Sequence, residues 1–193
     1  MIADKDRSGW FGASDTSYIV GSWETKSFAK WWLEKEGVMR NDYCNLAMSA
    51  GTHKEHQILE YINAAELDKQ ILMPDLRLRV NLDGDDDQYI YEVKTYKLSN
   101  GFRVPKKYWQ QVQVQMYASG LHCKIVAYGL TEEDYYNFLL PIDSNRLSIY
   151  DIEYDCNFIE NDYLPKLRYF KHCLDHHLLP RKKDFYVYSK KNI

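Results

Sequence analysis

Two segments with alternating apolar and polar residues lie close together near the middle of the chain. The first, LRLRVNLD (residues 76–83), has leucine or valine at every second position, and the second, YIYEVKTY (89–96), places Ile90, Glu92 and Lys94 on one face. Because side chains alternate between the two faces of a strand, each segment predicts a β-strand. The short polar sequence GDDDQ between them predicts an antiparallel hairpin, around which the rest of the chain must fold.

Helical patterns stand on both sides of this hairpin. A short helix is predicted to begin near Ser14-Asp15, and longer helices are predicted at about 25–36, 49–63 and 107–119. The segment CKIVAYGL (123–130) and the regions around 136–140 and 147–154 predict strands, and residues 157–177 predict a long helix that Pro165 would kink or split. This order of elements predicts an α/β or α+β fold with a central mixed sheet flanked by helices.

The chain has 193 residues, without an internal repeat or a linker-like stretch. We therefore expect a single domain over residues 1–193, with a peripheral basic tail at about 181–193. Seventeen tyrosines, seven phenylalanines and five tryptophans supply large side chains for a core. The stripe formed by Phe28, Trp31 and Trp32 predicts a buried helix face rather than an aromatic ligand cage.

Several functional classes lack their sequence requirements. The four cysteines, at 44, 123, 156 and 173, form no CxxC pair, which argues against zinc-ribbon, iron–sulfur and thioredoxin sites and favours reduced, mostly buried thiols. Without an apolar stretch of about 18 residues or an apolar signal core, we expect a cytoplasmic protein that neither spans a membrane nor is secreted. The net charge of −3 does not indicate nucleic-acid binding, although one basic strip can bind phosphate on an acidic protein.

Acidic residues in the predicted elements point to metal chemistry. Glu55 lies on the apolar face of helix 49–63, where a carboxylate needs a partner or a cation. In the hairpin, Asp83 ends the first strand while Glu92 and Lys94 share a face of the second, so both carboxylates can reach one edge. Such oxygen ligands suit Mg²⁺, and the lysine could orient or deprotonate a water or neutralise transition-state charge. Together these residues predict a metal-assisted phosphodiester hydrolase site.

Each feature alone has a simpler interpretation. Glu92 and Lys94 could form an ion pair on a solvated strand face, and Asp83-Gly84 could be an ordinary turn pair. The acidic run 85–87 is interpreted as the solvated tip of the hairpin. The combination of the features carries the hydrolase hypothesis.

Five ordered sequence blocks resemble the YqaJ-like viral recombinases, the family of phage lambda exonuclease within the PD-(D/E)xK nuclease superfamily. RSGWFGASD is similar to the family's Arg and Gly-x-Ser-Asp/Glu segment, and MSAGTHKEHQILEYI to its Gly-x-x-x-Glu helix. RVNLDG and YEVKT resemble its Asp-Gly and Glu-x-Lys strands, and VPKKYWQQVQVQMYASG its Tyr-x-x-Gln-Val-Gln helix. The resemblance covers about residues 7–179 and implies a restriction-endonuclease-like core.

The resemblance also implies roles for the matching residues at the metal. Asp83 and Glu92 would bind the ion, together with the carbonyl group of Val93 and with Glu55. Lys94 would be the catalytic lysine that positions the attacking water. The implied cofactor is Mg²⁺, with Mn²⁺ as a substitute.

Contacts to DNA are implied on both sides of this centre. Gln113 and Gln111 would stand beside the nucleophile or the scissile phosphate. Arg7 and Ser14 would hold a terminal 5′ phosphate, in agreement with the anion affinity of a helix start beside an arginine. The candidates for backbone contacts, whose alternative is a solvated loop, are Lys97, Arg103, Lys106 and Lys107.

The activity implied by the resemblance is that of a Mg²⁺-dependent DNA exonuclease of phage-type recombination. It would degrade the 5′ strand from double-stranded DNA ends, in the 5′–3′ direction, and leave 3′ overhangs. Its partners would be a phage single-strand annealing protein and two further copies in a ring-like homotrimer, inside a bacterial host cell. The alternatives are a PD-(D/E)xK endonuclease of restriction or repair, and a catalytically inactive DNA- or protein-binding module.

Overall fold

The alternating segments of the sequence form adjacent strands of one five-stranded sheet, with strand order β1-β2-β3-β4-β5. The computed structural model describes residues 6–40 and 45–191. Strands β3 and β4 are parallel, and the other neighbouring pairs are antiparallel, so the sheet is mixed as predicted. The strands are β1 (Glu66–Met73), β2 (Leu78–Asp85), β3 (Tyr89–Lys97), β4 (His122–Leu130) and β5 (Leu147–Ile152).

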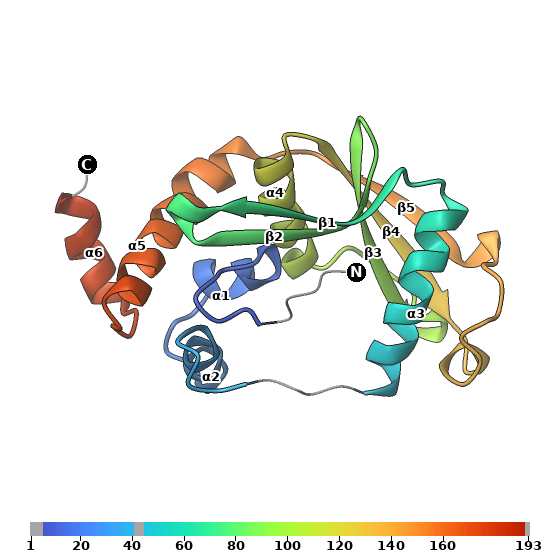
Figure 1. Ribbon diagram of the computed structural model, residues 1–193, viewed down its shortest axis with the longest axis horizontal. Helices are drawn as coiled ribbons and strands as arrows, with labels where there is room; N and C mark the ends of the chain where they lie inside the picture. Colours follow the sequence, from blue (N-terminus) through green and yellow to red (C-terminus); the bar gives the residue numbers. More distant parts are fainter. Residues whose placement is uncertain (1–5, 41–44, 192–193) are drawn as a thin grey trace.

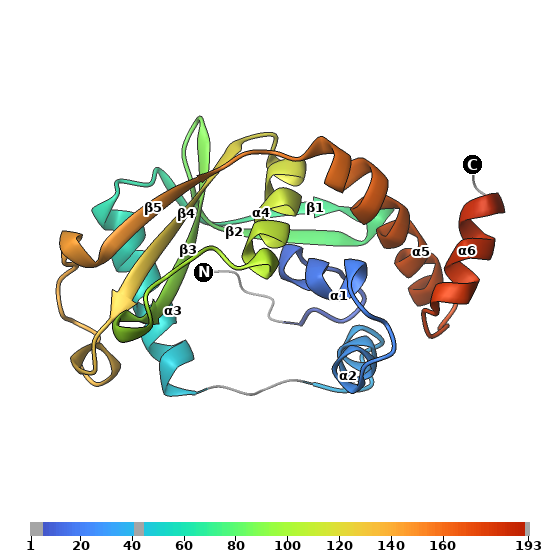
Figure 2. The ribbon, with the colours of Figure 1, turned by 180° about the vertical axis from the view of Figure 1, so that it is seen from behind.

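Helices cover both faces of this sheet (Figures 1 and 2). Helix α4 crosses from β3 to β4 and contacts α1 and β2, whereas α3 contacts β3. The predicted α+β architecture is confirmed. The helices of the described residues are α1 (Thr16–Val20), α2 (Lys26–Lys35), α3 (Leu46–Tyr61), α4 (Lys106–Ser119), α5 (Leu164–Asp175) and α6 (Lys182–Lys191).

The sheet divides into two parts that are joined by very few residues. Pairing between β2 and β3 covers only Gly84 with Tyr91 and Asp85 with Ile90 among the described residues. Beyond these pairs, the β1–β2 ribbon runs toward α5 while β3, β4 and β5 run the other way, as Figure 1 shows. We call the space between the diverging parts of β2 and β3, at residues 81–83 and 92–94, the fork. The backbone groups that line the fork must find partners other than the opposite strand.

The larger core lies on the α4 side of the sheet and is rich in aromatic rings. Phe170 of α5 packs against Phe11, Trp31 and Trp32, with ring centroids 5.7–6.1 Å apart. The predicted buried stripe of α2 is confirmed, because Phe28, Trp31 and Trp32 are all buried. A smaller core on the opposite face joins α3 to β3 and β4.

Helix boundaries follow local capping chemistry. The hydroxyl group of Thr25 accepts a hydrogen bond from the Phe28 N–H group at 3.1 Å, which fixes the start of α2. Helix α4 ends at Gly120, whose φ of +73° is a left-handed conformation that glycine adopts without strain. Among the described residues, every helix is too short or too polar to cross a bilayer.

Strand β1 was not predicted from the sequence. It is an edge strand, most of its side chains are exposed, and the residues of its polar sequence do not alternate. Its pairing with β2 skips Asp68, which has a left-handed φ of +57°, and the same register resumes at Lys69. The interpretation of residues 85–87 as a solvated tip is wrong for Asp85, which is buried and lies 2.7 Å from Lys69 of β1.

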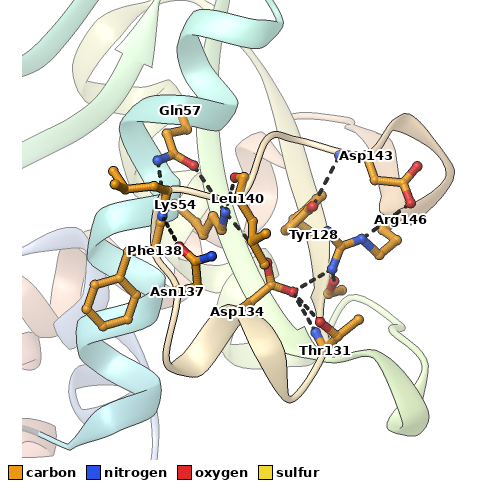
Figure 3. Close-up of polar contacts among 12 residues, drawn as sticks. Lys54, Gln57, Tyr128, Thr131, Asp134, Asn137, Phe138, Leu140, Asp143 and Arg146 are labelled. Atoms are coloured by element: carbon orange, nitrogen blue, oxygen red, sulfur yellow. Dashed lines mark hydrogen bonds and ion pairs between the residues drawn. The ribbon is translucent and has the colours of Figure 1, made fainter.

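The predicted strand at 136–140 is also wrong, because helix α3 takes up its backbone groups. Lys54 donates to the carbonyl oxygen of Leu140 at 2.5 Å, and Gln57 donates to that of Phe138 at 2.8 Å (Figure 3). Fully buried Lys54 also lies 3.5 Å from Asp134, which is paired in turn with Arg146. These contacts fasten the loop between β4 and β5 to α3.

The long helix predicted at 157–177 is found as a continuous helical segment at 156–175 that changes its hydrogen-bonding pattern just before Pro165. Residues Phe158–Tyr163 form a π-helix that continues into α5, with Pro165 in the first turn of α5, where its missing N–H group is tolerated. The basic tail forms α6, whose Phe185 packs against Trp23 and Tyr169. Cys123 and Cys173 are buried, Cys156 is exposed, and Cys44 lies outside the described residues.

Candidate active site

The fork brings the predicted catalytic strands together. Asp83 lies on β2 beyond the last residue pair of the β2–β3 ladder, and its Oδ2 atom accepts a hydrogen bond from the Val93 N–H group at 2.9 Å. The carboxylate thus takes the place of a ladder partner for the β3 backbone. This contact holds Asp83 beside Glu92 and Lys94.

The Glu92 carboxylate is buried, with 2% of the residue exposed, and it accepts hydrogen bonds from three side chains. Its Oε1 atom accepts from Lys94 and from the Gln111 amide, the latter at 2.6 Å. Its Oε2 atom accepts from the amide of Gln115, which lies one turn further along α4. The two oxygens are therefore held by different donors.

Lys94 carries its positive charge in this site. Burial of Lys94 opposes the charge, but the carboxylates of Glu92 and Asp83 outweigh burial and raise the pKa of the ammonium group above its ordinary value. The ammonium nitrogen also lies 4.8 Å from the centroid of the Tyr108 ring. Lys94 is a permanent cation at neutral pH and is held in place from two sides.

Glu55 reaches the same centre from α3. Burial and the nearby charge of Glu92 raise the pKa of its carboxyl group. Burial, Glu92 and Glu55 raise the pKa of Asp83 well above its ordinary value. Three carboxyl groups therefore repel one another here, although Lys94 offsets part of the repulsion.

A glycine allows α3 to approach β3 at this point. A Cβ atom on Gly51 would lie 2.9 Å from the hydroxyl oxygen of Thr95. Gly51 and Glu55 are four residues apart and lie on one face of the helix, so the small residue lets the acidic one reach the fork. Both residues line a cleft of about 580 Å³, together with Val93, Lys94 and Tyr108.

The donor set fits a hard divalent cation. Asp83 and Glu92 of the strands and Glu55 of α3 offer carboxylate oxygens as ligands. A cation bound between them would relieve the repulsion among the three carboxylates. Glu55 also belongs to a group with His56 and Asp68, found among the described residues, whose ligand atoms lie within 4.8 Å of one another. The Nε2 atom of His56 lies 3.2 Å from the Oδ2 atom of Asp68, and both side chains are partly exposed.

The two glutamines predicted beside the nucleophile are placed differently. Gln111 contacts the Glu92 carboxylate. Gln113 is buried elsewhere, where its amide donates to the Glu153 carbonyl at 2.8 Å and accepts from the Asp155 N–H group at 2.7 Å. Gln115 was missed, although its spacing of four residues from Gln111 places both on one helix face.

The predicted phosphate ligands lie together near the N-terminus. Arg7 donates to the Ser14 hydroxyl at 3.3 Å on the surface. Buried Asp15 anchors this segment, because it accepts from the Gly12 N–H group at 2.7 Å and from the Trp31 indole at 2.8 Å. Asp15 is also paired with Lys35 at 2.5 Å. The segment that carries the Arg7–Ser14 pair is thus anchored to α2 through Asp15.

The predicted backbone contacts are exposed. Lys97 is paired with Glu132 at 2.6 Å, and the Lys107 ammonium nitrogen lies 4.8 Å from the Tyr108 ring centroid. Arg103 and Lys106 are exposed just before and at the start of α4. Lys97 lines the cleft, and so does Tyr108, whose ring Lys107 contacts.

In this mixed sheet, β2 carries Asp83 and β3 carries Glu92 and Lys94, and the two strands diverge at these residues. This arrangement defines a nuclease-like α+β fold. The model of the YqaJ-like viral recombinase domain matches residues 4–122, and the protein belongs to this family. Its structure is similar to that of an alkaline exonuclease, LHK-Exo, from Laribacter hongkongensis, with a TM-score of 0.65 and 21% sequence identity over 96% of this chain and 94% of that one. A crystal structure of SSO0001 is similar with a TM-score of 0.48 and 12% identity, over 91% and 80% of the two chains. No curated protein sequence gives a significant match.

Proposed function

We propose that the protein is a divalent-metal-dependent deoxyribonuclease that degrades double-stranded DNA from its ends. The observation that carries the proposal is the convergence of Asp83, Glu92 and Lys94 in the fork, with Glu55 facing them from α3. Membership of the YqaJ-like viral recombinase domain family supports a role in phage-type recombination. The similarity of the fold to an alkaline exonuclease agrees with action at DNA ends.

The proposed reaction is hydrolysis of a phosphodiester bond. The oxygen of a water attacks phosphorus, the bond to the leaving 3′ oxygen breaks, and a proton passes to the leaving oxygen. Mg²⁺, or Mn²⁺ in its place, bound by Asp83, Glu92, Glu55 and the Val93 carbonyl, would lower the pKa of a bound water and neutralise charge on the phosphate.

Lys94 and Gln111 act beside the scissile phosphate in this proposal. The ammonium group of Lys94 orients the attacking water and stabilises the negative charge that develops on phosphorus oxygens. The Gln111 amide already contacts Glu92, so it can hold that carboxylate and reach the nucleophile from the same side. The role implied for Gln113 receives no support from its contacts, which are to the backbone at 153 and 155.

End dependence tests this proposal. Linear duplex DNA labelled at its ends should be degraded in Mg²⁺ or Mn²⁺ and remain intact in EDTA, and covalently closed circular duplex should resist. Labels on the 5′ or the 3′ strand then report polarity, for which we propose 5′–3′ degradation that leaves 3′ overhangs. Cutting of the closed circle would identify an endonuclease of restriction or repair, and binding without any cleavage would identify an inactive binding module.

Two further proposals concern assembly. We propose that the protein acts in a ring-like homotrimer and works with a single-strand annealing protein in a bacterial host. Both rest on the family resemblance alone. Light scattering of the purified protein would give the number of copies.

Arg7 is expected to select 5′-phosphorylated ends. The variant Arg7→Ala loses a charged donor to phosphate, so the preference for 5′-phosphate over 5′-hydroxyl ends should fall by about tenfold, the equivalent of about 1.4 kcal/mol. Initial rates on the two substrates measure this ratio. Arg168→Ala, which removes an exposed arginine of α5, serves as the matched control. An unchanged ratio in Arg7→Ala would remove Arg7 from the phosphate site.

A further inference from the structure

A second glutamine of α4 occupies the fork behind Glu92. Gln115 is 1% exposed, and its Nε2 atom donates both to the Glu92 carboxylate and to the Asn81 carbonyl group, 3.3 Å away. These contacts join α4, β2 and β3 where the ladder between the two strands has ended. We propose that Gln115 is a positioning residue that fixes the orientation of the Glu92 carboxylate. This inference rests on the proposed function, in which Glu92 binds the metal.

The two oxygen atoms of the Glu92 carboxylate accept hydrogen bonds from different donors and differ in the acceptor positions that they have left. Oε1 accepts from Lys94 and Gln111, and a carboxylate oxygen has about two acceptor positions, so Oε1 is saturated. Oε2 accepts from Gln115 and therefore keeps one acceptor position for a further ligand. The terminal torsion of a glutamate is broad, and only contacts of this kind select one orientation. Without the Gln115 amide, the carboxylate could rotate and present both oxygens to Lys94 and Gln111.

The other end of the Gln115 side chain argues that the amide is not there for packing. Its Oε1 atom is buried and has no hydrogen-bond partner among the described residues. A buried carbonyl without a partner is unfavourable, and an apolar side chain of similar size would avoid that cost. Gln113 on the same helix provides the contrast, since its amide is bonded at both its nitrogen and its oxygen to the backbone. The hydrogen bond to Glu92 therefore explains why a glutamine stands at position 115.

Gln115→Leu tests the inference, because leucine keeps most of the volume and removes the amide. Calorimetry on the DNA-free protein should show Mn²⁺ binding at least fivefold weaker than in the wild type. The Mg²⁺ concentration for half-maximal hydrolysis should rise by a similar factor, while KM for DNA stays unchanged. The melting temperature in EDTA should fall, because the buried Oε2 atom of Glu92 and the Asn81 carbonyl group lose a hydrogen-bond donor.

Val114→Ala is the matched control, since Val114 is the fully buried neighbour of Gln115 on α4. It should lower the melting temperature by creating a cavity and leave Mn²⁺ binding unchanged. Gln115→Met, measured in the same way, provides a second variant of similar volume if the leucine variant does not fold.

The outcomes separate this inference from the proposed function. Mn²⁺ binding of wild-type strength in Gln115→Leu or Gln115→Met overturns the positioning role, and so does a wild-type protein that binds no Mn²⁺. If the variants bind Mn²⁺ more weakly than the wild type, but the wild type cleaves no DNA, the positioning role is supported and the proposed nuclease function is rejected.

Discussion

Replacing Lys94 with alanine is expected to abolish DNA hydrolysis, with kcat at least about 10³-fold lower, while the metal still binds. The ammonium group stands between Glu92 and the Tyr108 ring, where it can orient a water and stabilise charge on phosphate. Lysine offers no oxygen ligand, and its removal frees one of the two occupied acceptor positions on the Oε1 atom of Glu92. Mn²⁺ affinity should therefore equal or exceed that of the wild type.

Calorimetry with Mn²⁺ and single-turnover cleavage of end-labelled duplex, performed on the same protein, check both parts of this result. Lys124→Ala is a suitable control, because Lys124 lies on the neighbouring strand β4, opposite Tyr91, and contacts the Tyr89 ring at 3.9 Å. It should retain full activity. Weaker metal binding in Lys94→Ala would contradict the assigned role, because it would make Lys94 part of the metal site's support.

Asp83→Asn is expected to lose both metal binding and hydrolysis, and to melt at a higher temperature than the wild type in EDTA. Removing a carboxylate ligand should weaken Mn²⁺ binding by at least about 100-fold, since changes outside the ligand set already cost 10–100-fold. The gain in stability has a different origin. Burial and the charges of Glu92 and Glu55 disfavour the ionised form of Asp83 in the folded protein. An asparagine oxygen can still accept from the Val93 N–H group.

The pH dependence of this gain follows from the direction of the shift. The pKa of Asp83 is higher in the folded than in the unfolded protein, so its ionisation destabilises the fold at high pH. The difference in melting temperature between Asp83→Asn and the wild type should reach its maximum at pH values above the raised pKa of Asp83. It should vanish as the pH falls below about 4, where an unfolded aspartate is also protonated. Thermal melts in EDTA from pH 3 to pH 9 measure it, and a variant less stable than the wild type at neutral pH would refute the account.

The sequence predicted those strands and helices in which apolar residues recur at the period of the element. The apolar alternation of β2 and the aromatic stripe of α2 are both buried, and this periodicity is visible in a single sequence. Strand β1 could not be seen, because an exposed edge strand needs no apolar alternation and its register is set by β2. The apolar run at 136–140 looked like a strand, but its carbonyl groups bond to Lys54 and Gln57, which are more than 80 residues away in sequence.

The candidate site was predicted in outline and missed in one detail. Asp83, Glu92 and Lys94 meet as their strand positions require, and the helical pattern at 49–63 placed Glu55 on an inward face. The motif drew attention to Gln111 and Gln113, yet residues two apart on a helix face different directions. Helical spacing alone would have pointed to Gln115 instead of Gln113. What no sequence pattern could supply was the unpartnered oxygen of Gln115, which depends on three elements meeting.

Because the ladder between β2 and β3 ends early, the Val93 N–H group is hydrogen-bonded to a side chain instead of to the opposite strand. The Val93 N–H group is shielded from solvent exchange by the side chain of Asp83, whereas the amides of the ladder proper are shielded by opposing backbone. We therefore expect its rate of deuterium uptake to change when the Asp83 carboxylate is protonated or binds a metal ion. Amide exchange at Val93 should thus report on the candidate site in the absence of DNA and turnover.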